Sequence, residues 1–267
     1  MSRIFRIQSG QADLVGESNG SGEALVFLHA GVADRRMWRP QMEAFQNSHQ
    51  VVAYDRRGFG ETTSPDEPFS NTQDLESVLN HFDLTKVTLV GCSQGGRIAI
   101  DFALTFPDRV NKLVLIAPAI SGAVPPEEIP ADIEALLEEL EKAEEADDLE
   151  WVNKIEAHLW LDGPQSKAGR VSGPLRGLFL DMNGIALAMP ELEKETEPAS
   201  AYERVSQLTM PTLVLWGDLD FPHIQDRCRY LVESIPAAQG QEIKGTAHLP
   251  NLERPDIVNN YLSHFLE

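Results

Sequence analysis

The chain lacks the features that would place it in a membrane or send it out of the cell. Its 267 residues contain no uninterrupted apolar run of about 20, the length that a membrane-spanning helix needs. Residues 1–11 are polar and lack the apolar stretch of a secretory signal. We therefore expect no membrane association and, by default, a cytoplasmic location.

Cysteine and positive charge are also scarce. The two cysteines, Cys92 and Cys228, form neither a C-x-x-C pair nor a zinc-type cluster, so two reduced thiols are expected in the cytoplasm. The 42 aspartates and glutamates outnumber the 22 lysines and arginines, which gives a formal net charge of −20. Such a field repels phosphate backbones and argues against nucleic-acid binding.

Much of this acidity lies in one segment. Residues 121–200 hold 19 acidic side chains against 6 basic ones. We interpret the segment as a solvated helical surface that keeps the protein soluble. The alternative is an acidic rim around a site, which would disfavour anionic substrates.

Short apolar runs alternate with helical patterns along most of the chain. The continuous apolarity of the runs is typical of strands covered on both faces, as in a parallel sheet. The alternation predicts an α/β fold with a mostly parallel, doubly wound sheet, preceded by a hairpin of residues 4–7 and 13–15. The predicted strands are 25–28, 51–54, 87–90, 113–116, 212–216 and 241–244, and the predicted helices are 37–45, 71–81, 94–106, 225–234 and 255–265.

One segment, residues 122–199, interrupts this alternation. It offers no good strand, and apolar residues recur at helical spacing within its acidic stretch. The sequence therefore predicts a core of residues 1–121 and 200–267 with a helical cap, residues 122–199, inserted between two strands. The helices predicted in the cap are 131–146, 149–161 and 175–188.

The clearest chemical signal is the G-x-S-x-G pattern around Ser93, between a predicted strand and a predicted helix. A sharp turn at this place exposes the serine hydroxyl, and the residues two before and two after must be small. Gly91 and Gly95 meet that need. The following helix aims its free amides at the same point. We predict that Ser93 is a nucleophile.

A serine hydroxyl needs a base to take its proton. Four histidines follow Ser93, but His158 falls in the predicted cap and His264 on the last helix. His248 lies in a loop after the predicted strand 241–244, which is where catalytic side chains concentrate. We predict His248 as the base.

The acid that orients this base should follow a strand between the two. The strand 212–216 runs into a loop with two aspartates, whereas no acidic residue follows strand 113–116 before Glu127. Asp218 sits at the turn and can bond its own backbone, while Asp220 is freer to reach a histidine. We favour Asp220, with Asp218 as the alternative. A metal site formed by Asp218, Asp220 and His223 explains the loop less well, so no metal or other cofactor is expected.

Acyl transfer also needs donors for an oxyanion. The backbone amide of Gln94, directly after the nucleophile, is one candidate. The second should come from the loop after strand 25–28, where we favour the amide of Gly31, with Val32 and Ala30 as near alternatives. His29 is expected to brace this loop.

Taken together, these motifs resemble those of the α/β-hydrolase superfamily over nearly the whole chain. Ala30 and Thr62 depart from the residues usual at their positions, and a serine nucleophile argues against the dehalogenase and epoxide-hydrolase branches, which attack with aspartate. The motifs are residues 28–31 with Met37 and Trp38, residues 55–62 (Asp-Arg-Arg-Gly-Phe-Gly-Glu-Thr), residues 91–96, residues 217–220 (Gly-Asp-Leu-Asp) and residues 245–255.

The resemblance implies a hydrolase that cleaves a small carboxylic ester, lactone or related acyl compound. Carbon–carbon bond hydrolases and perhydrolases use the same triad, and the superfamily also contains ligand-sensing receptors with an intact triad. Arg56 and Arg57 are expected to stabilise their turn rather than bind an anion. Met182, Leu187 and Met189 either pack the cap or line an acyl pocket. The sequence does not indicate an oligomeric state.

Overall fold

The fold is built on one eight-stranded sheet. The computed structural model describes residues 3–196 and 198–267. Within them the strand order is β1-β2-β4-β3-β5-β6-β7-β8, and every pair from β4 to β8 is parallel, whereas β1–β2 and β2–β4 are antiparallel. The predicted α/β fold with a mostly parallel sheet is confirmed. The strands are β1 (Arg3–Ser9), β2 (Ala12–Asn19), β3 (Ala24–Leu28), β4 (Gln50–Tyr54), β5 (Val87–Cys92), β6 (Val110–Ile116), β7 (Thr212–Gly217) and β8 (Ala238–Ile243).

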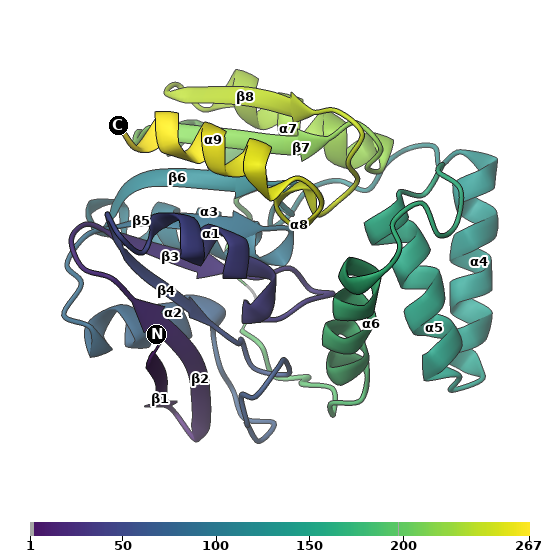
Figure 1. Ribbon diagram of the computed structural model, residues 1–267, viewed down its shortest axis with the longest axis horizontal. Coiled ribbons are helices and arrows are strands. Elements are labelled where there is room, and N and C mark those ends of the chain that lie inside the picture. Colours follow the sequence, from purple (N-terminus) through teal and green to yellow (C-terminus); the bar gives the residue numbers. More distant parts are fainter. Residues whose placement is uncertain (1–2, 197) are drawn as a thin grey trace.

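Helices cover both faces of this sheet, which explains why its central strands are apolar throughout. Alternate residues of a strand point to opposite faces, so Val26 of β3 packs in one core cluster and Phe27 in the other. Figure 1 shows α1, α8 and α9 in front of the sheet and α2, α3 and α7 behind it. Their bounds are α1 (Arg39–Phe45), α8 (Pro250–Glu253), α9 (Pro255–Leu266), α2 (Asn71–His81), α3 (Gln94–Thr105) and α7 (Pro222–Ser234).

The chain between β6 and β7 is helical and lies beyond the carboxyl ends of the parallel strands (Figure 1). The helix predicted at 149–161 changes at Ala157 from α-helix to a π-helical turn, a distortion that often occurs at functional sites. The bounds 122 and 199 of the cap stay a prediction. The helical elements here are α4 (Ala131–Glu145), α5 (Leu149–Glu156), η3 (Ala157–Asp162) and α6 (Pro174–Leu187).

Some predicted bounds were wrong. Strand β8 starts three residues before the predicted 241 because it is an edge strand with exposed polar residues, which leave no hydrophobic pattern. Helix α7 begins at Pro222 rather than 225, since proline at the first helical position needs no amide donor. Shorter 3₁₀ turns are η1 (Arg35–Trp38), η2 (Pro107–Arg109) and η4 (Tyr202–Gln207). None of the helices in the described ranges is both long and apolar enough to cross a bilayer.

Candidate active site

Ser93 occupies a strained turn between β5 and α3. Its φ angle is +53°, a left-handed value that is rare for a residue with a side chain. The turn closes only because its flanking residues lack side chains: a Cβ on Gly91 would lie 2.3 Å from the carbonyl oxygen of Gly95. The amide of Ser93 donates to the carbonyl of Ile116 (2.9 Å), which ties the turn to the neighbouring strand.

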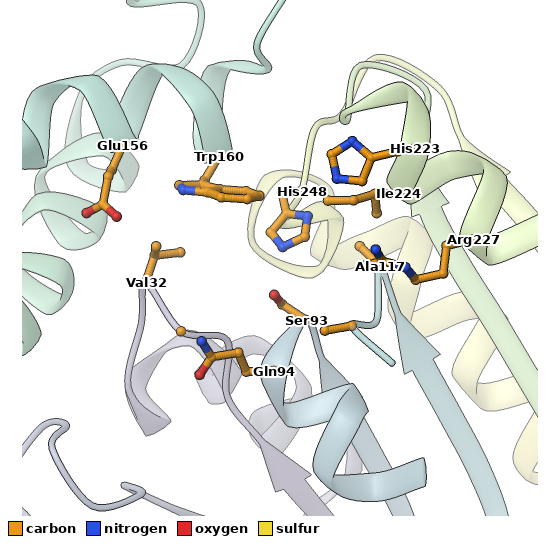
Figure 2. A pocket seen from close by; sticks show the side chains of 12 residues that line it. Val32, Ser93, Gln94, Ala117, Glu156, Trp160, His223, Ile224, Arg227 and His248 are labelled. Atoms are coloured by element: carbon orange, nitrogen blue, oxygen red, sulfur yellow. The ribbon is translucent and has the colours of Figure 1, made fainter. Parts of the chain in front are cut away.

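His248 and Asp220 are in direct contact. Nδ1 of the imidazole lies 2.7 Å from Oδ2 of the carboxylate, and the two residues are only 2% and 3% exposed. A proton on Nδ1 satisfies this bond and leaves the Nε2 lone pair free. Figure 2 shows the imidazole directly above the Ser93 hydroxyl. The second oxygen of Asp220, Oδ1, accepts from the amide of Phe221 (2.8 Å), which fixes the carboxylate.

Asp218, the alternative acid, has a different partner. Its Oδ1 accepts a 2.6 Å hydrogen bond from the amide of Gly245, and its Oδ2 lies 3.7 Å from Nζ of Lys244. Both partners belong to the turn that precedes His248. The structure therefore brings Asp220, and not Asp218, to the imidazole, while Asp218 holds the loop that carries it.

A cavity of about 330 Å³ opens over Ser93. It is lined by Ser93, His248 and Gln94, which Figure 2 shows, and by Gly31, so both predicted reacting groups and both predicted oxyanion residues border it. Gly31 is in close contact with the Gln94 side chain, since a Cβ there would lie 2.8 Å from its carboxamide. The other lining residues are Val32, Ala117, Ala119, Glu156, Trp160, His223, Ile224 and Arg227.

His29 braces the loop that carries Gly31. Its Nδ1 bonds the carbonyl of Ala30 (2.7 Å) and its Nε2 accepts from the amide of Arg56 (3.0 Å), so both ring nitrogens are occupied by backbone groups. Burial, assisted by the positive charge of Arg56, holds the pKa of His29 well below its ordinary value. A neutral, fully bonded imidazole fits the predicted supporting role.

The two arginines of the Asp55 turn also make internal contacts. Arg57 donates through Nε to Asp74 (2.8 Å) and through Nη2 to the carbonyl of Ser9 (2.6 Å), as a turn-stabilising residue should. Arg56 donates through Nη2 to the side-chain oxygen of Gln94 (3.1 Å), so it reaches the edge of the cavity through another side chain.

The helical segment lines the cavity with residues that the sequence did not single out. Met182 is fully buried in the core, and neither Leu187 nor Met189 is among the residues that line the cavity over Ser93 in the described ranges. Glu156 and Trp160 take that place instead. Both lie where α5 passes into the π-helical turn, a local change that hydrophobic periodicity does not reveal.

Burial shapes the charge of the cavity walls. The pKa of Glu156 is raised because its carboxylate is withdrawn from water, although the amide of Asn183 donates to its Oε2 (2.6 Å). On the other side, burial lowers the pKa of His223 and of Arg227. The sequence offered His223 as one of four histidines after the nucleophile and as a member of a disfavoured metal site, and its position gave no indication that it faces a cavity.

Comparison with known proteins agrees with this architecture. Residues 23–255 match the family model described as alpha/beta hydrolase fold. The chain belongs to the α/β-hydrolase family. The eight-stranded, mostly parallel sheet with helices on both faces agrees with this family.

Several relatives match this chain over most of their length, and they carry both hydrolase and synthase names. A 2-hydroxy-6-oxononadienedioate/2-hydroxy-6-oxononatrienedioate hydrolase of Pseudomonas putida is 27% identical, with 99% of this chain and 96% of the relative covered. A carboxylesterase of Bacillus subtilis (strain 168) is 23% identical, with 96% and 84% covered. The solved structure of a thermophilic esterase from Thermogutta terrifontis superimposes with a TM-score of 0.78 at 24% identity, covering 99% and 98% of the two chains.

Proposed function

We propose that this α/β hydrolase cleaves a small carboxylic ester or lactone through an acyl-serine intermediate. The observation that carries the proposal is the 2.7 Å contact of Asp220 with His248, whose other ring nitrogen faces the Ser93 hydroxyl in the cavity (Figure 2). This is the arrangement of nucleophile, base and orienting acid that acyl transfer requires.

The reaction follows from these positions. His248 takes the Ser93 proton at Nε2 as the oxygen attacks the substrate carbonyl, and Asp220 stabilises the imidazolium that forms. The backbone amides of Gly31 and Gln94 bind the oxyanion. His248 then gives its proton to the leaving alcohol and later activates the water that releases the acid.

The size of the cavity and its roof support a small substrate. About 330 Å³ lies at the lower end of the range for ligand pockets. Trp160 and Glu156 cover the cavity from above, and we propose that residues 122–199 act as a cap that limits substrate length.

Steady-state hydrolysis of p-nitrophenyl esters of increasing acyl length tests the proposal. Wild-type turnover should peak at a short acyl chain and fall by about 10⁴-fold or more in Ser93→Ala and in His248→Ala, because the triad acts as a unit. Equal rates in wild type and Ser93→Ala would contradict it. Ser166→Ala, which removes a hydroxyl from the helical segment outside the cavity lining, is the matched control.

A second candidate is the hydrolysis of a carbon–carbon bond by the same triad. The full-length similarity to the Pseudomonas putida hydrolase favours it. Turnover of a vinylogous diketone with no turnover of any ester would select this reaction. Slow single turnover of every substrate, with a ligand-dependent change in protease sensitivity of residues 122–199, would instead indicate a sensor.

A further inference from the structure

Arg227 is a cation in the cavity that has no partner in the described part of the chain. It lies on α7 and reaches the cavity beside Ala117 and Ile224 (Figure 2). Its guanidinium forms no ion pair and no hydrogen bond with any residue of the ranges 3–196 and 198–267. Its lowered pKa has burial as the first cause. A charge withdrawn from water without a partner destabilises a fold, so its position needs another explanation.

Most of the other partly buried arginines form ion pairs. Of the two that do not, Arg56 hydrogen-bonds Ala30 and Gln94, and Arg204 does not line the cavity. Among the described residues, Arg227 is therefore the arginine that lines the cavity without an ion pair. On its own helix, the exposed Arg229 lies 2.7 Å from Asp226 and 3.4 Å from Glu242. The paired, less exposed arginines are Arg35 with Asp55, Arg36 with Asp34, Arg57 with Asp74, Arg97 with Glu195, Arg109 with Glu76, Arg170 with Glu253 and Arg176 with Asp162.

We propose that Arg227 binds a carboxylate that the substrate carries in addition to its scissile ester or lactone group. The proposal rests on the hydrolase function above and specifies its substrate class. A guanidinium offers two parallel N–H donors that match the two oxygens of a carboxylate. Because Arg227 and Ser93 line one cavity of about 330 Å³, a single small molecule can reach both.

The charges around the cavity favour one orientation of the bound substrate, with its carboxylate toward Arg227. Glu156 stands on the wall opposite Arg227 (Figure 2), so a carboxylate is repelled there and attracted at α7. A second hollow of about 470 Å³ shares His223 and Arg227 with the cavity but is lined also by Glu127 and Glu128. The acidic side chains of the helical segment therefore do not exclude anions from the cavity. They repel a carboxylate from the Glu156 side and so favour its binding at Arg227.

Paired substrates test this subsite. The monomethyl esters of succinate, glutarate and adipate are compared with neutral methyl esters of similar length, in wild type, Arg227→Gln and Arg229→Gln. In wild type, kcat/KM for at least one half-ester should exceed that of its neutral counterpart about tenfold or more. Arg227→Gln should lower the half-ester value about ten- to one-hundredfold, mainly through KM, and leave the neutral ester within a few fold.

The controls separate recognition from folding. Arg229→Gln removes the same charge from the same helix but outside the cavity, and should leave both substrate series unchanged. Arg227→Lys should retain part of the preference, because it keeps the charge and loses the two-donor geometry. Equal loss on both series in Arg227→Gln would indicate a structural role and overturn the proposal, as would a wild type without preference.

Binding distinguishes failure of the subsite from failure of the proposed reaction. Glutarate and its neutral diamide are titrated into Ser93→Ala by isothermal calorimetry. Glutarate should bind more tightly, and Arg227→Gln in the same background should abolish the difference. If no ester is hydrolysed but this difference is seen, the hydrolase function fails and the carboxylate subsite stands; if neither ligand is preferred, the subsite is disproved.

Discussion

Trp160 and His248 make two contacts, a backbone hydrogen bond and a packing of their rings. The amide of His248 donates to the carbonyl of Trp160 (3.3 Å), and the indole and imidazole centroids lie 4.7 Å apart. The first residue belongs to the π-helical turn of the helical segment and the second to the loop between β8 and α8. The proposed base is therefore positioned partly by the chain that roofs the cavity.

Replacing Trp160 should lower activity without unfolding the protein. We expect Trp160→Ala to reduce kcat/KM on a short p-nitrophenyl ester by about tenfold, since a small misplacement of a catalytic group is costly. Trp160→Phe should recover most of the loss because it restores an aromatic contact. Trp151→Ala, an exposed tryptophan of α5, is the matched control and should match wild type. Equal activity of wild type and Trp160→Ala would show that the imidazole is held without the indole.

The two aspartates of the β7 loop should differ in their effect on kcat. Asp220→Asn removes the charge that stabilises the imidazolium and disturbs the tautomer, so we expect a loss of about 10²- to 10⁴-fold. Asp218→Asn weakens only the hydrogen bond to Gly245 and should cost about tenfold or less. Steady-state kinetics with thermal unfolding as a control decides the matter; a larger loss in Asp218→Asn would reverse our assignment.

The contact between Arg170 and Glu253 should couple the helical segment to the histidine loop. Nη2 of Arg170 lies 2.6 Å from Oε2 of Glu253, whose Oε1 accepts from the amide of Ala247 (2.7 Å). Arg170 also donates to the carbonyl of Gly245 (3.0 Å). A double-mutant cycle with Arg170→Gln and Glu253→Gln should give a coupling of about 1–3 kcal/mol in the free energy of unfolding. Additive effects, within about 0.5 kcal/mol, would mean that the pair does not link the two segments.

Asp101 should make stability depend on pH. Burial raises the pKa of this carboxyl to about 6, although Ser121 donates to its Oδ2 (2.7 Å). Because the folded state binds a proton that the unfolded chain releases near pH 4, the contribution of Asp101 to stability falls as pH rises from about 4 to 6. The free energy of unfolding of wild type should thus decrease relative to Asp101→Asn across this window. Asp256→Asn, at an exposed site, is the control, and parallel curves for wild type and Asp101→Asn would contradict the prediction.

Local patterns predicted most of the sheet, and they singled out Ser93, Asp220 and His248, which the structure brings close together. Apolar runs such as 87–90 mark strands covered on both faces, and small residues at 91 and 95 are demanded by a turn that leaves no room for a Cβ. Elements without a hydrophobic pattern were placed less well. The polar strand β8 illustrates this, because its position is set by pairing with β7 rather than by its own residues.

The walls of the cavity could not be derived in the same way. Glu156, Trp160 and Arg227 come from elements separated by up to 71 positions, and nothing in their local sequence fixes which side of a helix faces Ser93. Short-range sterics and periodicity, which act between neighbours along the chain, determined the strands, the turn and the order of the proposed catalytic residues. Tertiary packing decided the choice of Asp220 over Asp218 at the imidazole, the π-helical turn over His248 and the position of Arg227 in the cavity, since only the docking of distant elements brings these groups together.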